Sequence, residues 1–237
     1  MNIALIGYGK MGHEIERIAL ERGHIITCIV DIDTPNEIGS ESFMKADVAI
    51  EFSRPECAYE NYLKCFEAGM PVISGTTGWH DKIDNIKMAC KEGQTFFYAS
   101  NYSLGVNIFF ELSKKLSQIM NRFSSYDVSM KEIHHTQKMD SPSGTAITLA
   151  EDIIQIIDRK HKWINEGNNT PEELSIISER TGQVPGFHEI TWDSDVDTIT
   201  ITHNAKNRVG FALGAVLAAE FTYGKKGFLG MSDMLGF

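Results

Sequence analysis

The sequence has no long apolar segment. None of its hydrophobic runs approaches the roughly 20 residues that span a lipid bilayer, so we expect no transmembrane helix. Its start, Met1 to Gly7, lacks a basic leader and reaches a glycine after six residues, unlike a secretory signal peptide. We therefore expect a cytoplasmic protein.

Cysteine and basic residues are also scarce. The four cysteines show no Cys-x-x-Cys spacing, which favours reduced thiols in the core over a redox or metal site. Lysine and arginine total 22 against 32 aspartates and glutamates, giving a net charge of −10. A field of that sign repels nucleic acids and acidic membranes, and a small anionic substrate would need a locally positive site.

The first hundred residues contain alternating strand and helix patterns. Short apolar runs predict strands at residues 2–6, 25–30, 47–52, 72–74 and 95–98. The segments between them predict helices at residues 13–22, 55–68 and 80–90. Because strands joined through helices form parallel sheets, this part of the chain predicts an α/β Rossmann domain.

The pattern changes after Asn101. Helices are expected at residues 106–120, 142–160 and 208–221. Strands are expected at residues 126–134, 175–178, 188–192 and 198–203, with a turn at 195–197 and an exposed loop at 163–171. Strands joined directly indicate a mixed or antiparallel sheet in an α+β second domain. We place a dinucleotide-binding domain at residues 1–105 plus 208–237, and a substrate-binding domain at residues 106–207.

A glycine-rich loop follows the first strand. Gly7, Gly9 and Gly12 have the Gly-x-Gly-x-x-Gly spacing between a strand and a helix, the context of a dinucleotide-binding loop. Gly7 permits a tight turn, Gly9 lets the backbone approach a pyrophosphate, and Gly12 permits close helix–strand packing. Lys10 and Met11 lie inside the loop, before a helix whose N-terminal N–H groups attract the pyrophosphate.

An acidic residue follows the second strand. Asp31 lies about 20 residues beyond Gly12, where a carboxylate accepts hydrogen bonds from the adenosine ribose. A carboxylate there disfavours a 2′-phosphate, so we expect NADH to be preferred over NADPH, although Lys10 weakens that preference. FAD, or a glycine turn that binds no ligand, are the alternatives.

A second cluster of candidate residues lies at the end of the strand expected at 126–134. His134 and His135 point to opposite faces of that strand, which argues against one shared metal ion, and no carboxylate stands at a usual metal spacing. Lys138 can bind a carboxylate or donate a proton. Each histidine taken singly is more often structural, but the cluster with Lys138 favours catalysis.

The same segment continues into an expected helix. Pro142 suits the first turn of a helix. Ser143, Gly144 and Thr145 then present hydroxyls and backbone N–H groups at the N-terminus, which predicts an anion-binding cradle.

Two further loops follow strands of the first domain. Residues 75–78 and 99–107 both lie at carboxyl ends of strands, where open α/β sheets bind ligands. Plain turns are the alternative for both loops.

Several longer patterns occur in order along the whole chain. They are Gly-Thr-Thr-Gly at 75–78, Asn-x-Ser-x-Gly-Val-Asn at 101–107, Glu-x-His-His-x-x-Lys-x-Asp-x-Pro-Ser-Gly-Thr-Ala at 132–146, Arg-x-Gly-x-x-x-Gly-x-His at 180–188, His-x-Ala-x-x-Arg at 203–208 and Phe-Ala-x-Gly-Ala at 211–215. With the glycine loop, they make the chain resemble the 4-hydroxy-tetrahydrodipicolinate reductase (dihydrodipicolinate reductase) family of bacterial lysine biosynthesis. The double-histidine pattern is highly specific.

The resemblance implies NADH- or NADPH-dependent reduction of a cyclic unsaturated dicarboxylate to tetrahydrodipicolinate, in the pathway to diaminopimelate and lysine. It implies that His134 and Lys138 are the catalytic pair, with Lys138 as the proton donor. It also implies a homotetramer built through the sheet of the second domain. The implied substrate-binding residues are His135, Ser143, Gly144 and Thr145, and the residues implied along the nicotinamide are Gly75, Thr77, Ala99, Ser100 and Asn101.

The sequence departs from the family pattern in three places. Only residues 32–46 separate Asp31 from the next strand, where family members carry a further strand and helix, so the adenine side of the pocket is trimmed. Ile32 stands where an arginine often packs on adenine. Glu51 replaces the aspartate of an Asp-Phe-Thr/Ser segment.

Three other functions fit parts of the sequence. Another two-domain nicotinamide dehydrogenase would act on a sugar or an amino-acid aldehyde, and the full motif at 132–145 argues against it. A non-catalytic NAD(H)-binding protein would have no need of His134, Lys138 and Thr145. A metal site at His134 and His135 would give stoichiometric zinc in the purified protein.

Overall fold

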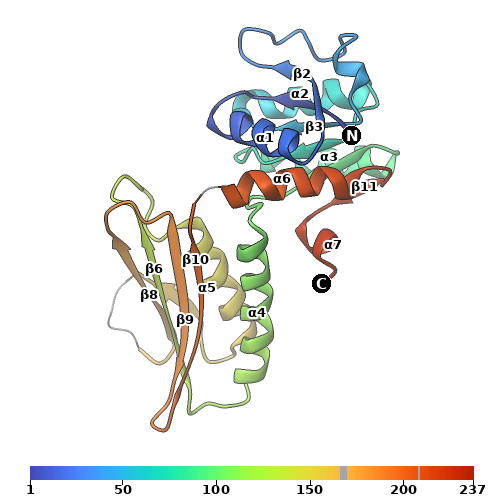
Figure 1. Ribbon diagram of the computed structural model, residues 1–237. Helices are drawn as coiled ribbons and strands as arrows, with labels where there is room; N and C mark the ends of the chain where they lie inside the picture. The colour runs from blue at the N-terminus through green and yellow to red at the C-terminus, as the bar shows by residue number, and fades with distance from the viewer. Residues whose placement is uncertain (166–169, 208) are drawn as a thin grey trace. The chain divides into compact units, whose positions relative to one another are not determined.

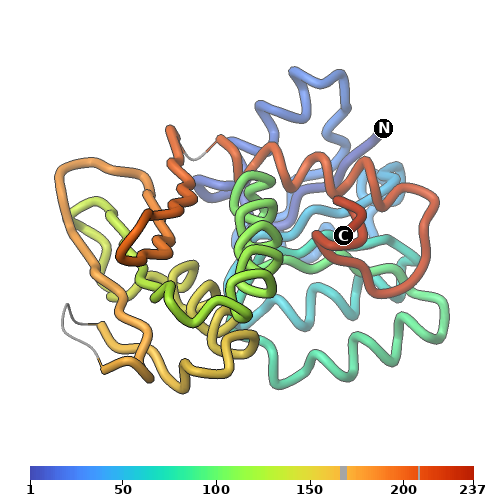
Figure 2. Tube along the Cα trace, turned by 90° about the horizontal axis from the view of Figure 1, so that it is seen from below, coloured from blue at the N-terminus to red at the C-terminus, as the bar shows by residue number. Residues whose placement is uncertain are grey.

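The computed structural model describes residues 1–165, 170–207 and 209–237, and the chain divides into two compact units. Unit 1 comprises Met1–Leu104 and Val209–Phe237, and unit 2 comprises Gly105–Arg208. Both ends of the chain lie in unit 1 (Figure 2). Within the described residues, no helix is long and apolar enough to cross a membrane.

Unit 1 is built on a six-stranded parallel sheet (Figure 1). The strand order is β11-β5-β4-β3-β1-β2, in which β1 lies between β2 and β3. The strands are β1 (Asn2–Ile6), β2 (Ile25–Val30), β3 (Val48–Glu51), β4 (Val72–Ser74), β5 (Thr95–Tyr98) and β11 (Gly227–Leu229). The sheet confirms the predicted Rossmann-like α/β fold, and β2 forms its edge because the connection to β3 holds only one short helical turn, η1 (Phe43–Lys45).

Helices cover both faces of this sheet. Alternate residues of β1 enter different cores, with Ile3 and Leu5 on one face and Ala4 and Ile6 on the other. The first face is covered by α1 (Lys10–Glu21) and α6 (Val209–Thr222), which lie side by side in Figure 1. The second face is covered by α2 (Pro55–Glu67) and α3 (Ile83–Lys91), the latter preceded by a turn, η2 (His80–Lys82). The short helix α7 (Met231–Leu235) packs on the first core.

Unit 2 contains a mixed five-stranded sheet packed on two helices. Its strand order is β10-β9-β6-β8-β7, with β10–β9 and β9–β6 antiparallel and the other pairs parallel. The core takes apolar residues from one face of the sheet and from both helices. The elements are α4 (Leu104–Met120), β6 (Asp127–His134), α5 (Gly144–Ile156), β7 (Lys162–Ile164), β8 (Glu173–Arg180), β9 (Gly186–Asp193) and β10 (Thr198–Ala205).

Several helix boundaries differ from the prediction, those of α1 and α5 among them. Helix α1 starts at Lys10, three residues earlier than expected, because Gly9 itself is the N-cap. Helix α5 spans Gly144–Ile156, whereas residues 142–160 were expected. It starts after Pro142 because the Ser143 hydroxyl caps the N–H of Ala146, and it ends early because Ile157 adopts an extended backbone.

Several short elements were not predicted from the sequence, β7, β11 and α7 among them. Residues 162–164 form β7 at the edge of the unit 2 sheet, whereas an exposed loop was expected there. Trp163 stabilises this strand by packing on the core. Strand β11 and helix α7 lie in the segment after 221, for which no structure was expected. Residues 166–169 of the expected loop, and Arg208 of the His-x-Ala-x-x-Arg pattern, lie outside the described residues.

Candidate active site

The glycine loop has the geometry that its spacing predicts. Gly7 has φ +89°, and a Cβ added there would lie 2.2 Å from the carbonyl oxygen of Phe52. A Cβ on Gly12 would lie 2.4 Å from the carbonyl oxygen of Gly7, so the helix approaches the strand closely. A Cβ on Gly9 would meet nothing within 4 Å, and no side chain caps the start of α1. The backbone at Gly9 is therefore open to a ligand, and no side chain of the cap competes for the first N–H groups of α1.

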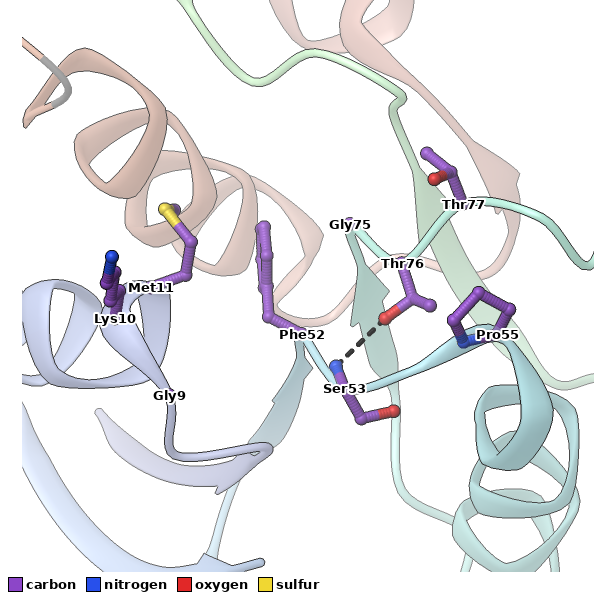
Figure 3. Close-up of a pocket in the computed structure, with 9 residues that line it drawn as sticks. All are labelled: Gly9, Lys10, Met11, Phe52, Ser53, Pro55, Gly75, Thr76 and Thr77. Carbon is purple, nitrogen blue, oxygen red and sulfur yellow. Dashed lines mark hydrogen bonds between the residues drawn. The ribbon is translucent and has the colours of Figure 1, made fainter. Parts of the chain in front are cut away.

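A pocket of about 460 Å³ opens beside this loop (Figure 3). It brings together five residues of the predicted cofactor site: Gly9, Lys10, Met11, Gly75 and Thr77. The rest of the lining is Phe52, Ser53, Pro55 and Thr76, which were not among the predicted cofactor residues. In Figure 3 the Phe52 ring stands between Met11 and Gly75. It packs so closely on Gly75 that an added Cβ there would lie 2.2 Å from the ring.

Two residues that line the pocket, Ser53 and Thr76, are hydrogen-bonded to a buried carboxylate, that of Glu51. Its Oε1 accepts hydrogen bonds from the Ser53 N–H at 3.1 Å, from the Ser53 hydroxyl and from the Thr76 hydroxyl at 3.1 Å. Its Oε2 accepts from the hydroxyls of Ser74 at 3.0 Å and Tyr62 at 3.2 Å. Burial raises the pKa of Glu51, and the hydrogen bonds from Ser53, Thr76 and Ser74 oppose that shift. Glu51 thereby ties the carboxyl ends of β3 and β4 together.

The remaining predicted cofactor residues lie outside the lining of this pocket. Asp31 follows β2 with an exposed side chain, and its backbone N–H bonds to the Thr34 hydroxyl at 3.0 Å. Ala99, Ser100 and Asn101 follow β5, with Ala99 buried in the core. The open backbone at Gly9, the uncapped helix and the pocket together fit a dinucleotide pyrophosphate running along the carboxyl ends of the strands.

The second group of candidate residues lies in unit 2 around His134. This histidine ends β6, and its Nδ1 bonds to the carboxylate of Glu132, which lies on the same face of the strand. The other oxygen of Glu132 accepts from Arg180 Nη2 at 2.9 Å and from the Ser143 N–H at 3.3 Å. Burial favours a higher pKa for Glu132, but the hydrogen bonds from His134 and Arg180 outweigh it and lower that pKa to about 2.

Ser143 connects this group to helix α5. Its hydroxyl caps the Ala146 N–H at 3.3 Å and lies 3.1 Å from Nε2 of His188, a buried residue of β9. Burial and the neighbouring His134 lower the pKa of His188 to about 3, so its ring is neutral. Gly144 and Thr145 follow Ser143 in the first turn of α5.

Lys138 follows β6 in the loop that leads to α5. Its ammonium group pairs with Asp140 at 2.8 Å, and this hydrogen bond lowers the pKa of the Asp140 carboxyl. Asp140 is exposed, so solvent screens the pair and an anionic ligand can compete for the ammonium group. His135 lies one residue past the end of β6 and is half-buried.

The structure corrects one statement about metal ligands. A carboxylate does stand near the histidines, because Glu132, His134 and His188 offer ligating atoms within 4.8 Å of one another. Both oxygens of Glu132, however, already accept hydrogen bonds from Arg180 and His134. This arrangement is a hydrogen-bonded ion-pair network, and a cation bound to Glu132 would have to displace the hydrogen bond from His134 or the one from Arg180.

Comparisons with known proteins agree with this geometry. The family described as "Dihydrodipicolinate reductase, N-terminus" matches residues 1–102, and "Dihydrodipicolinate reductase, C-terminus" matches residues 105–235. The chain belongs to the dihydrodipicolinate reductase family. The family and the Rossmann-like fold imply NAD(P)H binding.

Individual relatives span the chain. It is 48% identical over 237 residues to the 4-hydroxy-tetrahydrodipicolinate reductase of Christiangramia forsetii, covering 99% of this chain and 98% of that one. It is 33% identical over 228 residues to the enzyme of the same name from Neisseria gonorrhoeae, covering 93% and 84% of the two chains. A dipicolinate-bound dihydrodipicolinate reductase from Paenisporosarcina sp. TG-14 is 21% identical, with a TM-score of 0.79 over 98% of each chain, and shows the shared fold.

Proposed function

We propose that this chain reduces 4-hydroxy-tetrahydrodipicolinate to tetrahydrodipicolinate. The observation that carries the proposal is the 48% identity, along essentially the whole chain, to a relative named for that reaction. The double-histidine motif supports it, because three of its residues, Glu132, His134 and Ser143, are linked by hydrogen bonds beside the start of α5. In this reading unit 1 binds the cofactor, and unit 2 binds the substrate.

The 4-hydroxyl group of the substrate must leave as water, and the bound dinucleotide would supply a hydride to the unsaturated ring that this leaves. The chain must then supply a proton to the enamine that results, and the ammonium group of Lys138 is the donor we propose. The N–H groups of Gly144 and Thr145 and the Thr145 hydroxyl, at the helix start that Ser143 caps, would hold the two carboxylates together with His135. His134 would assist proton transfer. The substrate is a dianion, so these donors provide the locally positive site that an acidic protein needs.

The test is a coupled assay. The unstable substrate is made in place from pyruvate and aspartate semialdehyde by the preceding synthase, and NADH or NADPH oxidation is followed by absorbance. Oxidation that depends on the synthase is the expected result, and Lys138→Ala should lose most of its turnover while retaining NADH binding. Protein that binds NADH but oxidises neither cofactor would instead favour a non-catalytic or differently specific protein.

For the cofactor, we propose that NADH is preferred because Asp31 stands at the end of β2. Replacing Asp31 by alanine removes the acceptor for the ribose hydroxyls and the repulsion toward a 2′-phosphate. Asp31→Ala should therefore weaken NADH binding and leave NADPH binding unchanged or tighter, as measured by fluorescence titration. Equal losses for the two cofactors would show that Asp31 does not contact the ribose.

A further inference from the structure

The Arg-x-Gly-x-x-x-Gly-x-His pattern at residues 180–188 has no role in the scheme above. In the structure its residues surround His134: Arg180 bonds to Glu132, Gly186 lies against the His134 ring, and His188 bonds to Ser143. The pattern therefore marks the immediate surroundings of the proposed catalytic histidine.

The first constraint on His134 is the direction of its hydrogen bond to Glu132. At neutral pH the Glu132 carboxylate is ionised, since its pKa is about 2, and an ionised carboxylate only accepts hydrogen bonds. The Nδ1 atom of His134 must then be the donor and carry a proton. When the ring is neutral, its Nε2 atom carries the lone pair.

The second constraint is that the Glu132 carboxylate cannot turn. Two donors hold its other oxygen, Arg180 Nη2 at 2.9 Å and the Ser143 N–H at 3.3 Å. Arg180 is fixed in turn, because Nη2 also donates to the Asp140 carbonyl oxygen at 2.6 Å and Nη1 donates to that of Glu179 at 2.8 Å. Glu132 is fully buried, so no water replaces these donors.

The third constraint acts on the Nε2 side of the ring. A Cβ on Gly186 would lie 3.1 Å from His134 Nε2, so glycine keeps that side clear. The ring of His188 stands edge-on to the ring of His134, with centroids 5.1 Å apart. The charged and titratable groups around His134 are thus Glu132, Arg180 and the neutral His188, with the Lys138–Asp140 pair following in the same loop.

We propose that Glu132, held by Arg180, is a positioning residue that keeps the His134 proton on Nδ1, so that Nε2 is the ring atom that exchanges a proton during the reaction. The part of this inference that concerns proton exchange rests on the proposed function. The part that concerns the ring tautomer stands on the contacts alone.

Wild-type protein gives a direct test. In protein labelled with ¹⁵N-histidine, long-range ¹H–¹⁵N spectra distinguish the protonated ring nitrogen from the bare one, and His134→Gln identifies the resonances of His134. In the neutral ring, Nδ1 should carry the proton and Nε2 should be bare. Deprotonation at Nδ1 would overturn the proposal without the need for any variant at Glu132.

Glu132→Gln tests the cause. The two donors on the far side of residue 132 hold the amide oxygen, so the amide NH₂ group faces Nδ1 and the ring must move its proton to Nε2. We expect the tautomer to invert and kcat to fall on the order of 10²-fold, with the Kd for NADH within about twofold of wild type. An unchanged tautomer in folded Glu132→Gln protein would overturn the inference.

Glu179→Gln is the matched control. It makes the same chemical change in the neighbouring strand, where the Glu179 side chain pairs with Lys131 at the surface. This variant should keep the wild-type tautomer and kcat, and an inverted tautomer in it would show that the effect is not specific to Glu132. If the tautomer inverts in Glu132→Gln but the wild-type protein has no reductase activity, the positioning role stands and the proposed function fails.

Discussion

Two buried polar side chains, Glu51 and His188, affect the stability of the protein, and the sequence pattern around them does not indicate this. Glu51 has no cation beside it among its hydrogen-bond partners, which are one N–H group and four hydroxyls. The carboxylate thus organises polar donors at the ends of two strands.

Glu51→Ala should weaken both the fold and the cofactor site. Removing the carboxylate leaves the hydroxyls of Ser53 and Thr76 without their acceptor, and such losses cost about 3 kcal/mol of unfolding free energy when the groups are buried. Because both residues line the pocket, NADH binding should weaken as well. Urea unfolding and fluorescence titration measure the two effects. Glu51→Gln, which keeps one oxygen, should lose less, and Glu60→Ala on the exposed side of α2 should match wild type.

His188 makes the stability of the protein depend on pH. Its pKa falls from 6.5 in the unfolded chain to about 3 in the folded one, so below pH 6.5 the unfolded chain binds a proton that the folded chain excludes. Stability is therefore fully present above pH 6.5 and is lost as the pH falls toward 3. Between pH 7 and pH 5 this amounts to about 2 kcal/mol.

His188→Gln should lack that part of the pH dependence in urea unfolding curves recorded at pH 7 and pH 5. His161→Gln, at an exposed histidine of the same unit, should retain it. Parallel pH dependence in wild type and His188→Gln would show that His188 is charged in the folded protein.

At the scale of elements, helix α6 owes its position to small residues. A Cβ on Gly214 would lie 1.8 Å from the carbonyl oxygen of Tyr102, whereas a Cβ on Gly210 would meet only the Ser103 hydroxyl oxygen at 3.8 Å. Gly214→Ala should therefore force the helix away from the core and lower the unfolding free energy by about 3 kcal/mol. Gly210→Ala should change it by less than about 1 kcal/mol, and in the stabilising direction. Equal effects of the two changes on the thermal midpoint would contradict this packing argument.

The elements that could be predicted from the sequence are those that a local pattern of apolar residues identifies. Strands such as β1 and β5 are continuous apolar runs, and the Rossmann fold follows from their alternation with helices. Strands β7 and β11 are three residues long and exist because a longer neighbour pairs with them, which no local pattern encodes. Helix α5 was overestimated because the apolar pattern continues past the residue where the backbone turns.

The same distinction applies to the candidate site: contacts within one segment of the chain could be predicted, whereas contacts between distant segments could not. His134, Lys138 and the Ser143 cradle form one contiguous motif, so their proximity could be predicted. The contact between Arg180 and Glu132 joins residues 48 positions apart through the pairing of β6 with β8, so it could not. The Arg-x-Gly-x-x-x-Gly-x-His pattern marked residues 180–188 in the sequence, but it did not indicate which residues they contact.

At the scale of the whole molecule, we propose a homotetramer assembled through the sheet of unit 2. The face of that sheet opposite its helices carries apolar side chains, including the exposed Ile177 and the half-buried Ile133 and Phe187. Light scattering after size exclusion should give four times the 26.5 kDa of one chain. Ile177→Asp should yield a smaller species and Val196→Asp, in an exposed turn, should not; a wild-type monomer would contradict the proposal.

Unit 1 is made of two segments of the chain, Met1–Leu104 and Val209–Phe237, with unit 2 between them in the sequence. This arrangement determines the order in which the two units are completed during synthesis. Unit 2 is one continuous segment, whereas the sheet of unit 1 receives its last strand, β11, from residues that follow all of unit 2. When a ribosome has released unit 2, strand β5 still has an unpaired edge, and the face that α6 will cover is bare. A bare strand edge is a template for pairing with another chain. The interval between the completion of unit 2 and the arrival of β11 is therefore when a nascent chain most needs protection from its neighbours.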